Sequence, residues 1–307
     1  MLRVSATISV HDLRKSYGSL AAVDGISFEV EQGEFFGILG PNGAGKTTTL
    51  EILEGLRQPD SGELAVLGLA PWPRNPALLP RIGVQLQSSS FFERLTVREQ
   101  IDTFASLYGV PSRRADQMLG MVGLDEQANV RTEKLSGGQA QRLSIACALV
   151  HDPELVFMDE PTGALDPQAR RNLWDLLRKI NADGRTVVLT THHMDEAETL
   201  CDRVAIMDHG KLLELGPPAA LVREVDQPVR ISIESGLLDR ATADQVAAAA
   251  ASADGVSDDG VSLTFATRKP AVILADLADR NALAGLRVQG ATLEDVFLKL
   301  TGREYRA

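Results

Sequence analysis

A glycine-rich segment at residues 40–48 carries the most explicit chemistry in this sequence. It reads Gly-Pro-Asn-Gly-Ala-Gly-Lys-Thr-Thr and lies between an apolar run at 34–39 and a helix-like run at 49–53. A strand, a glycine-rich loop and a helix in this order predict a phosphate-binding loop, because the loop N–H groups and the helix N-terminus attract an anion. We expect Lys46 to reach the β- and γ-phosphates of a nucleoside triphosphate and Thr47 to ligate Mg²⁺. The loop residues expected to bind the nucleotide are Asn42, Gly43, Ala44, Gly45, Lys46, Thr47 and Thr48.

Two carboxylates end a second apolar run and suit magnesium-assisted hydrolysis. Asp159 and Glu160 follow Leu-Val-Phe-Met at 155–158. A buried parallel strand places such residues at the carboxyl edge of its sheet, where α/β folds bind ligands. We expect Asp159 to hold the metal through water and Glu160 to orient or deprotonate the attacking water. His192 follows another apolar run, at 186–190, and is expected to contact the γ-phosphate at the same edge.

Two further features have both a functional and an ordinary interpretation. The segment Leu-Ser-Gly-Gly-Gln at 135–139 opens an apolar helical run, so it is either a second anion-binding helix N-terminus or a common helix cap. Tyr17 stands before a turn in a chain with 5% aromatic residues. Its ring suits stacking on a nucleobase, and it equally suits a half-buried position in a sheet.

Composition indicates a folded domain that is not built for nucleic acid. The chain has 307 residues, a net charge of −11 and no run rich in Lys and Arg, whereas phosphate backbones require a basic face. Its two cysteines, Cys147 and Cys201, lie in apolar helix-like surroundings and are interpreted as buried reduced thiols. No apolar run approaches the ~20 residues of a membrane span. Any membrane-spanning part is therefore expected in another chain.

With these elements in this order, the chain resembles the ATP-binding subunit of an ABC (ATP-binding cassette) transporter. The most specific feature is the signature at 135–139, between the phosphate loop and Met-Asp-Glu-Pro-Thr at 158–162. The resemblance implies an α/β fold, an ABC-type nucleotide-binding domain with a RecA-like parallel-sheet core, an antiparallel β subdomain and a helical subdomain at about 88–134. It also implies an ATPase coupled to transmembrane transport, with ATP and Mg²⁺ as cofactors.

The resemblance assigns roles to single positions. It makes Tyr17 the residue that stacks on adenine, in place of the half-buried sheet residue that composition favours. It makes Gln87 the glutamine that touches Mg²⁺ and senses the attacking water. Gln85 is the rival, but the distance to Leu-Thr-Val at 95–97 favours Gln87.

Other positions follow from the same resemblance. Glu160 becomes the catalytic base, His192 the switch histidine and Ala164-Leu165-Asp166 the D-loop, in which Asp166 is expected at the nucleotide. Relatives often have an aromatic residue where His193 stands, so His193 receives no role. Gly163 replaces the more usual serine, a departure that should not abolish activity.

Geometry predicts that the chain works as a pair. It offers two phosphate-binding helix N-termini, at 43–48 and 136–139, but one complete magnesium site. Two chains paired head to tail would form two composite sites, each completed by the partner's signature. The resemblance assigns to the opposite subunit's γ-phosphate Ser136, Gly137, Gly138 and Gln139. The expected partners are a second copy or a paralogous cassette and a separate integral-membrane permease, with this chain on the cytoplasmic face of the membrane.

The chain after residue 220 is expected to form a separate domain. The cassette is assigned to 1–220 and a small C-terminal α/β accessory domain to 221–307, with a β-α-β-β-α-β-like order and a last helix at 292–301. The end of the chain, at 292–302, resembles cassettes of the drug-, antibiotic- and polysaccharide-exporter branch, of which daunorubicin-resistance ATPases are an example. The domain is interpreted as a stabilising or dimerising appendage without a ligand.

The leading functional prediction is the ATPase subunit of an exporter for drugs, antibiotics or lipid-like compounds. A cassette acting on DNA or ribosomes would require a coiled-coil insertion or two cassettes in one chain, and this sequence has neither. A third possibility is a cassette for import or lipoprotein release. Only the resemblance of the end of the chain to exporter cassettes argues against it. Phe91 and Phe92 begin the helical insert and either form a socket for a permease helix or pack beneath the insert.

Overall fold

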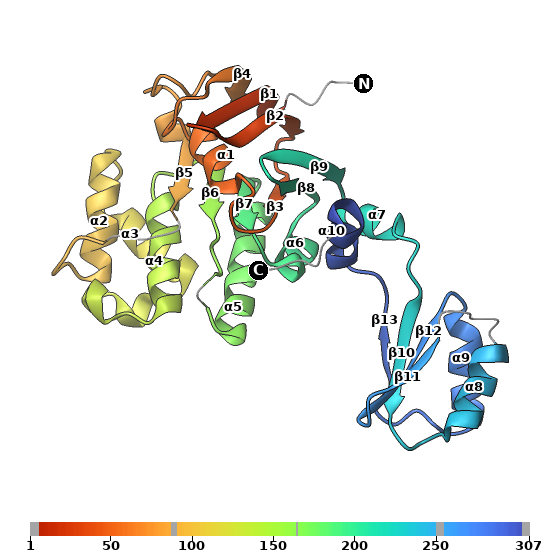
Figure 1. Ribbon diagram of the computed structural model, residues 1–307. Coiled ribbons are helices and arrows are strands. Elements are labelled where there is room, and N and C mark those ends of the chain that lie inside the picture. The colour runs from red at the N-terminus through yellow and green to blue at the C-terminus, as the bar shows by residue number, and fades with distance from the viewer. Residues whose placement is uncertain (1–5, 87–90, 164, 250–254, 303–307) are drawn as a thin grey trace. The chain divides into compact units, whose positions relative to one another are not determined.

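The computed structural model describes residues 6–86, 91–163, 165–249 and 255–302. Contacts within the chain define two compact units that divide between Pro218 and Ala219. We call the first the nucleotide unit and the second the C-terminal unit. Figure 1 labels their helices and strands.

The nucleotide unit is built on a six-stranded sheet with the order β5-β6-β7-β3-β8-β9. The first five strands of that order are mutually parallel, and β9 pairs antiparallel with β8. The bounds of the strands in that order are Ile82–Gln85, Leu155–Asp159, Thr186–Thr191, Phe35–Leu39, Arg203–Asp208 and Lys211–Gly216.

The central strands are buried along their whole length, as expected of parallel strands covered on both faces. Every residue of β3, β6 and β7 is buried. Helix α1 (Lys46–Leu53) packs against β6 and β7, α4 (Gly137–Leu149) against β5, and α6 (Met194–Leu200) against β3. Helix α5 (Pro167–Ala182) packs against α4 and α6. Because the strands are parallel, their carboxyl ends meet at one edge, and α1 begins at that edge.

A second sheet of three antiparallel strands lies beside α1 and has the order β2-β1-β4. Its strands are β1 (Ile8–Tyr17), β2 (Leu20–Val30) and β4 (Ser61–Val66). Inward-facing side chains of these strands join those of α1 and the central sheet in one hydrophobic core. The antiparallel β subdomain that the resemblance implies is therefore confirmed.

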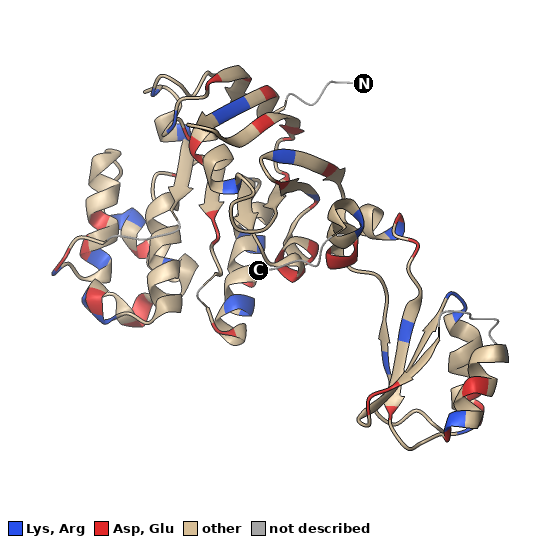
Figure 2. Cartoon of the chain, viewed as in Figure 1, with Lys and Arg blue, Asp and Glu red and all other residues tan. Residues whose placement is uncertain are grey.

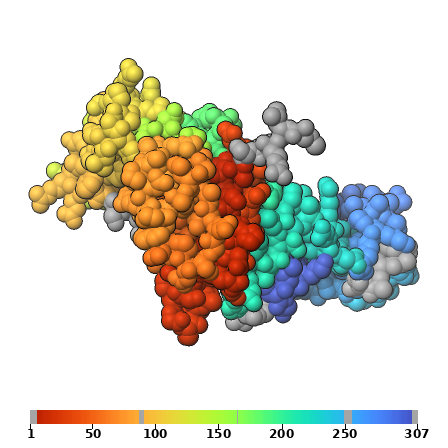
Figure 3. Space-filling view, turned by 90° about the horizontal axis from the view of Figure 1, so that it is seen from above, coloured from red at the N-terminus to blue at the C-terminus, as the bar shows by residue number. Residues whose placement is uncertain are grey.

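The helical insert consists of α2 (Val97–Leu107) and α3 (Arg113–Val122), which pack on each other and on α4. Helix α2 begins with a capping box, in which the Thr96 side chain accepts from Glu99 N–H and the Glu99 side chain accepts from Thr96 N–H. In the surface view of Figure 3 the insert, in yellow, stands beside the orange and red antiparallel sheet.

The C-terminal unit contains a four-stranded antiparallel sheet with the order β11-β12-β10-β13. Helices α8 and α9 cover one face, where Ile231, Ile233 and Phe265 pack against their apolar side chains. The chain order β10-α8-β11-β12-α9-β13 confirms the predicted pattern. The bounds in chain order are α7 Pro218–Arg223, β10 Val229–Glu234, α8 Arg240–Ala249, β11 Val256–Asp258, β12 Ser262–Thr267, α9 Pro270–Asp279, β13 Arg287–Gln289 and α10 Leu293–Thr301.

Two simple predictions about the chain are tested directly. Cys147 and Cys201 are free and buried, and burial raises the pKa of the Cys147 thiol to about 12. Both therefore remain protonated thiols at neutral pH. None of the described helices is long and apolar enough to span a membrane.

Candidate functional site

The phosphate loop joins the buried end of β3 to the start of α1. Its backbone requires glycine, since Gly45 has a φ of 100° and a Cβ there would lie 2.1 Å from the Ala22 carbonyl oxygen. Gly43 also has a positive φ, of 82°. A side chain at Gly45 would force the loop away from β2, so these residue types fix the loop's position at the sheet edge.

Lys46 lies at the centre of the loop and is 4% exposed. Its ammonium group donates hydrogen bonds to the carbonyl oxygens of Gly40 at 2.8 Å and Pro41 at 3.2 Å. It also lies 3.2 Å from Glu160 Oε1. The loop carbonyls and Glu160 therefore hold the Lys46 ammonium group in place. A bound phosphate would compete with them for its hydrogen bonds.

Asp159 ends β6 directly opposite the first turn of α1. The Thr47 hydroxyl donates to Asp159 Oδ1 at 3.2 Å, and the Thr190 hydroxyl donates a very short hydrogen bond to the same oxygen. Burial raises the pKa of Asp159, and the hydrogen bonds from Thr190 and Thr47 oppose that rise. The structure thus brings together Thr47 and Asp159, two of the three residues predicted to bind the metal.

Glu160 stands at the same edge with an unusual backbone. Its φ is 45°, the left-handed region that residues other than glycine rarely adopt. The Glu160 N–H stabilises this geometry by donating to the carbonyl oxygen of Thr190 at 3.2 Å and to its hydroxyl at 3.0 Å. The backbone turn aims the carboxylate at the phosphate loop.

The carboxylate of Glu160 has two polar neighbours. Lys46 contacts one oxygen, and His192 Nδ1 lies 3.1 Å from the other. Burial alone would raise the pKa of Glu160, but the positive charge of Lys46 and hydrogen bonds from His192 and Lys46 outweigh it and lower the pKa. Glu160 is therefore ionised at neutral pH, the state in which it can accept a proton.

Tyr17 lines a hollow of about 290 Å³ beside the loop. Its ring is 41% exposed, with Lys15 Nζ 5.7 Å and the Arg57 guanidinium carbon 5.3 Å from the ring centroid. Asp60 holds Lys15 at 2.7 Å, and Glu51 holds Arg57 at 2.5 Å. The other residues lining this hollow are Leu20, Ala22, Asn42, Gly43, Gly45, Lys46, Thr47, Thr48 and Glu160.

The signature opens α4, apart from this cluster. Ser136 caps the helix by accepting from Gln139 N–H at 3.3 Å, and Gln139 Oε1 accepts from Ser136 N–H at 2.9 Å. Gly138 faces the first turn of α5, since a Cβ there would lie 3.4 Å from Ala169 Cβ. Asp166 caps α5 by accepting from Gln168 and Ala169 N–H, each at 2.9 Å. Among the described residues, no hydrogen bond or ion pair joins the signature or Asp166 to the phosphate loop.

Of the two candidates for the glutamine at the metal, Gln85 is described in the structure and Gln87 lies outside the described residues. Ala164 of the predicted D-loop also lies outside them. Gln85 ends β5, is 1% exposed and donates through Nε2 to the Leu86 carbonyl oxygen at 2.5 Å. Its Oε1 has no hydrogen-bond partner within the described chain.

Comparisons with known proteins agree with this geometry. An ABC transporter family model matches residues 23–163. The Nod factor export ATP-binding protein I of Ralstonia nicotianae is 40% identical over 97% of this chain and 95% of its own length. The protein of the same name from a Rhizobium species is 40% identical over 97% of each chain. This chain belongs to the ABC transporter ATP-binding subunits.

Solved ABC structures show the same fold. The cbiO1 protein of Clostridium perfringens, part of the ABC transporter complex cbiONQ, has a TM-score of 0.66 at 29% identity, covering 71% of this chain and 91% of that chain. The ATP-binding cassette MJ0796, in a dimeric post-hydrolysis state bound to ADP and Pi, has a TM-score of 0.62 at 29% identity, covering 68% of this chain and 98% of that chain. The predicted fold class is confirmed, as is the prediction of an ABC transporter ATPase that binds ATP. The relatives' names state Nod factor export and give no support to antibiotic resistance.

Sequence reasoning missed Thr190 in this ABC site. Its hydroxyl is fully buried and joins the metal candidate Asp159 to the backbone of Glu160. The available signal was a hydroxyl residue at the end of the apolar run at 186–190, at the same sheet edge as His192. Glu54, after α1, was also missed; it is 3% exposed, and burial followed by the nearby charges of Asp159 and Glu51 raises its pKa to about 9.

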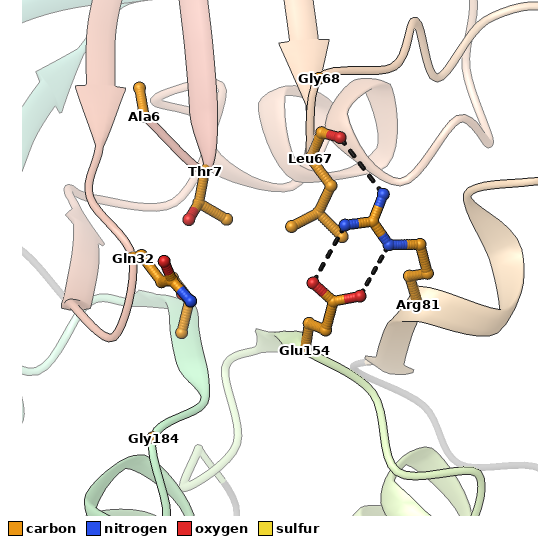
Figure 4. Close-up of a pocket in the computed structure, with 9 residues that line it drawn as sticks. Ala6, Thr7, Gln32, Leu67, Gly68, Arg81, Glu154 and Gly184 are labelled. Atoms are coloured by element: carbon orange, nitrogen blue, oxygen red, sulfur yellow. Dashed lines mark hydrogen bonds and ion pairs between the residues drawn. The ribbon is translucent and has the colours of Figure 1, made fainter. Parts of the chain in front are cut away.

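A second hollow, of about 370 Å³, lies at the opposite edge of the sheet. Figure 4 shows Arg81 and Glu154 joined by two hydrogen bonds, of 2.7 and 3.0 Å, on one side of it, with Thr7 and Gln32 on the other. Arg81 and Glu154 precede β5 and β6, so this hollow lies at the amino ends of those strands. It is separate from the site of ATP chemistry.

Proposed function

We propose that this ABC subunit hydrolyses ATP as half of a head-to-tail pair of cassettes that drives export through a separate permease. The observation that supports this most is the convergence of Lys46, Asp159 and Glu160 at one sheet edge, while the signature opens α4 without a described contact to that cluster. One chain therefore supplies two different halves of an ATP site. A second copy, or a paralogous cassette, would supply the missing half to each.

In this proposal the loop and Tyr17 hold ATP. Lys46 exchanges its contacts with the Gly40 and Pro41 carbonyls for the β- and γ-phosphates, and the N–H groups at the start of α1 face the same anion. The exposed ring of Tyr17 stacks on the adenine. Lys15 and Arg57, each fixed by a carboxylate, keep cations beside that ring.

Thr47 and Asp159 fit a magnesium ion. Their side-chain oxygens are 3.2 Å apart, and hydroxyl and carboxylate oxygens are ligands that Mg²⁺ prefers. No group of three or more His, Cys, Asp or Glu side chains among the described residues forms a metal site by itself, which suits an ion shared with phosphate and water oxygens. When bound, the ion neutralises charge on the phosphates. We propose that Gln87 contributes to the same ion.

Glu160 is proposed as the general base. Its lowered pKa keeps the carboxylate ionised, so it can take a proton from a water placed for attack on the γ-phosphate. His192, which lies 3.1 Å from the second carboxylate oxygen, orients that carboxylate and faces the γ-phosphate. The partner's Ser136, Gly137, Gly138 and Gln139 complete the phosphate site, and Asp166 shapes the loop between the two halves.

Replacement of Glu160 by glutamine tests this proposal. The amide has the same shape but cannot accept the proton, so Glu160→Gln should bind ATP, hydrolyse it at least ~10²-fold more slowly and accumulate an ATP-bound dimer. Turnover and size-exclusion chromatography with MgATP measure both effects. Glu63→Gln is the matched control, because Glu63 is an exposed residue of β4, and it should behave as wild type. A monomeric Glu160→Gln variant with wild-type turnover would contradict the proposal.

Export is proposed from the relatives named for Nod factor export and from the exporter-like end of the chain, which together favour export over import. The proposed substrates are drug-, antibiotic- or lipid-like compounds, of which the antibiotic part rests on the resemblance alone. The permease would contain the substrate path and hold this subunit on the cytoplasmic face of the membrane. Transport assays with the co-purified permease and candidates from each class test the substrate.

Phe92 is the proposed contact for the permease. Its side chain is 53% exposed, and its ring centroid lies 6.5 Å from that of Phe104 in a tilted arrangement. Phe92→Ala should leave the isolated subunit's ATPase rate unchanged and weaken co-purification with the permease. Leu107→Ala, at a 72% exposed position at the end of α2, is the control. Loss of basal ATPase in Phe92→Ala would instead make this residue part of the core.

A further inference from the structure

The C-terminal unit leaves one face of its sheet open. Helices α8 and α9 cover the face that contains Ile231 and Ile233. Because side chains alternate along a strand, Arg230, Ser232 and Glu234 of β10 point to the other face. A hollow of about 620 Å³ lies on that open face, within the range of small-molecule sites. Its polar lining residues include Arg230, Ser232, Glu234, Ser262, Arg287 and Gln289.

Two arginines on this face are close neighbours. Arg230 pairs with Gln289 and Ser232 with Arg287 in the antiparallel register of β10 and β13, so Arg230 and Arg287 occupy diagonal positions. Diagonal neighbours lie about 7–8 Å apart, within reach of two long side chains that converge on one group. Figure 2 shows the basic bands on both strands.

Neither guanidinium takes part in a hydrogen bond or ion pair within the described part of the chain, although the protein is acidic, with a net charge of −11. The other arginines of the sheet and its helices are neutralised: Arg240 by Asp244, Arg268 by Asp226 and Arg280 by Asp276. The neighbouring positive charges repel each other on the open face. An anion placed between them would remove that repulsion.

We propose that this face is a binding site for a small, soluble phosphorylated molecule. Guanidinium groups bind phosphate oxygens through paired hydrogen bonds, and two of them match the charge of a diphosphate. The Gln289 amide supplies a further donor at the rim of the hollow, whereas the Ser262 hydroxyl already donates to Asp259. Glu234 lies on the same face, diagonal to Arg287 and away from Arg230, and restricts the anion to the arginine end. The site belongs to the C-terminal unit and is separate from the ATP site.

Inorganic pyrophosphate is the probe for the test. Calorimetry would compare the full-length chain with the double variant Arg230→Gln/Arg287→Gln, each carrying Lys46→Ala to weaken binding at the phosphate loop. The double variant should bind pyrophosphate at the second site at least roughly tenfold more weakly, because two charge-assisted contacts are lost. Arg240→Gln, on α8, is the control and should keep the affinity. Raising the salt concentration should weaken this binding.

Three results would overturn the proposal. The first is equal pyrophosphate binding by the parent chain and the double variant. The second is the absence of any second site in the parent chain. The third is arginine-dependent binding to phosphatidylcholine vesicles containing phosphatidylglycerol without pyrophosphate binding, which would make the face a membrane contact. Because the substituted side chains are exposed, the double variant should keep the wild-type melting temperature, which verifies that it folds.

Discussion

The central sheet and the C-terminal sheet of this protein hold their charged groups in opposite ways. At the carboxyl edge of the central sheet, Lys46 and His192 each lie within 3.2 Å of the Glu160 carboxylate, and Asp159 accepts hydrogen bonds from two hydroxyls. On the open face of the C-terminal sheet, Arg230 and Arg287 face solvent without a described partner. The first arrangement fixes groups for chemistry before ATP arrives, and the second leaves binding groups to be ordered by a ligand.

The difference predicts where substitutions will be severe. A buried charge that loses its partner remains unsolvated, so changes at the sheet edge affect several groups at once. Substitution of an exposed charged residue removes only the contacts of that residue, because water solvates the groups that remain. We therefore expect coupled effects in the nucleotide unit and local effects in the C-terminal unit.

The largest effect is expected for Lys46→Ala. Removal of this buried cation should raise the dissociation constant for ATP at least tenfold and slow hydrolysis by on the order of 10²–10³-fold, because it contacts both the loop and Glu160. Calorimetry and steady-state turnover measure the two quantities. Lys179→Ala, at an exposed position of α5, is the control. An unchanged dissociation constant would place Lys46 outside the site.

Thr190 should show an intermediate effect that depends on its hydroxyl. Thr190→Val removes the hydrogen bonds to Asp159 and to Glu160 N–H while keeping the side-chain volume, and should lower kcat roughly tenfold. It should also raise the Mg²⁺ concentration needed for half-maximal activity. Thr190→Ser keeps the hydroxyl and should retain both values. Equal losses in the two variants would indicate a packing role instead.

Glu54 should make stability depend on pH. Its pKa of about 9 in the folded protein exceeds the ordinary value of 4.5, so the folded state keeps a proton that the unfolded state releases between those values. The free energy of unfolding contributed by Glu54 therefore falls as pH rises through this window. Glu54→Gln should reduce the drop in melting temperature between pH 5.5 and 8.5 by a few degrees. Parallel curves for the variant, the wild type and the control Glu63→Gln would contradict this assignment.

The smallest effect is expected from removing the C-terminal unit. A chain ending at Pro217 keeps β9 and every residue of the sheet edge, so its dissociation constant for ATP should stay within about twofold of wild type. Calorimetry on the truncated chain measures it. Loss of nucleotide binding would make the C-terminal unit part of the cassette.

The sequence predicted the features that a local motif reveals. It missed those that depend on which strands lie side by side in the sheet. Gly45, Lys46 and Asp159 were found because a strand, loop and helix have local patterns. Thr190 was missed because its partners come from another strand, and its role depends on β6 and β7 lying side by side.

The C-terminal unit gives the same lesson. The order of its strands and helices was predicted from the sequence. The pairing of Ser232 with Arg287, which places two arginines together, became visible once β13 was paired with β10. The interpretation of this domain as a stabilising or dimerising appendage without a ligand stays a prediction, and the proposed anion site is the alternative to it.

Mixing two inactive variants tests the central claim, that each ATP site is built from two chains. Lys46→Ala damages a chain's phosphate loop, and Gly137→Asp puts a repelling carboxylate at the start of α4, where no atom would clash with a Cβ. In a one-to-one mixture about half of the dimers are mixed, and each mixed dimer keeps one intact site of two. Each variant alone should be inactive, and the mixture should regain about a quarter of the wild-type ATPase rate. A mixture that stays inactive, or a Gly137→Asp variant that is active alone, would contradict the composite site.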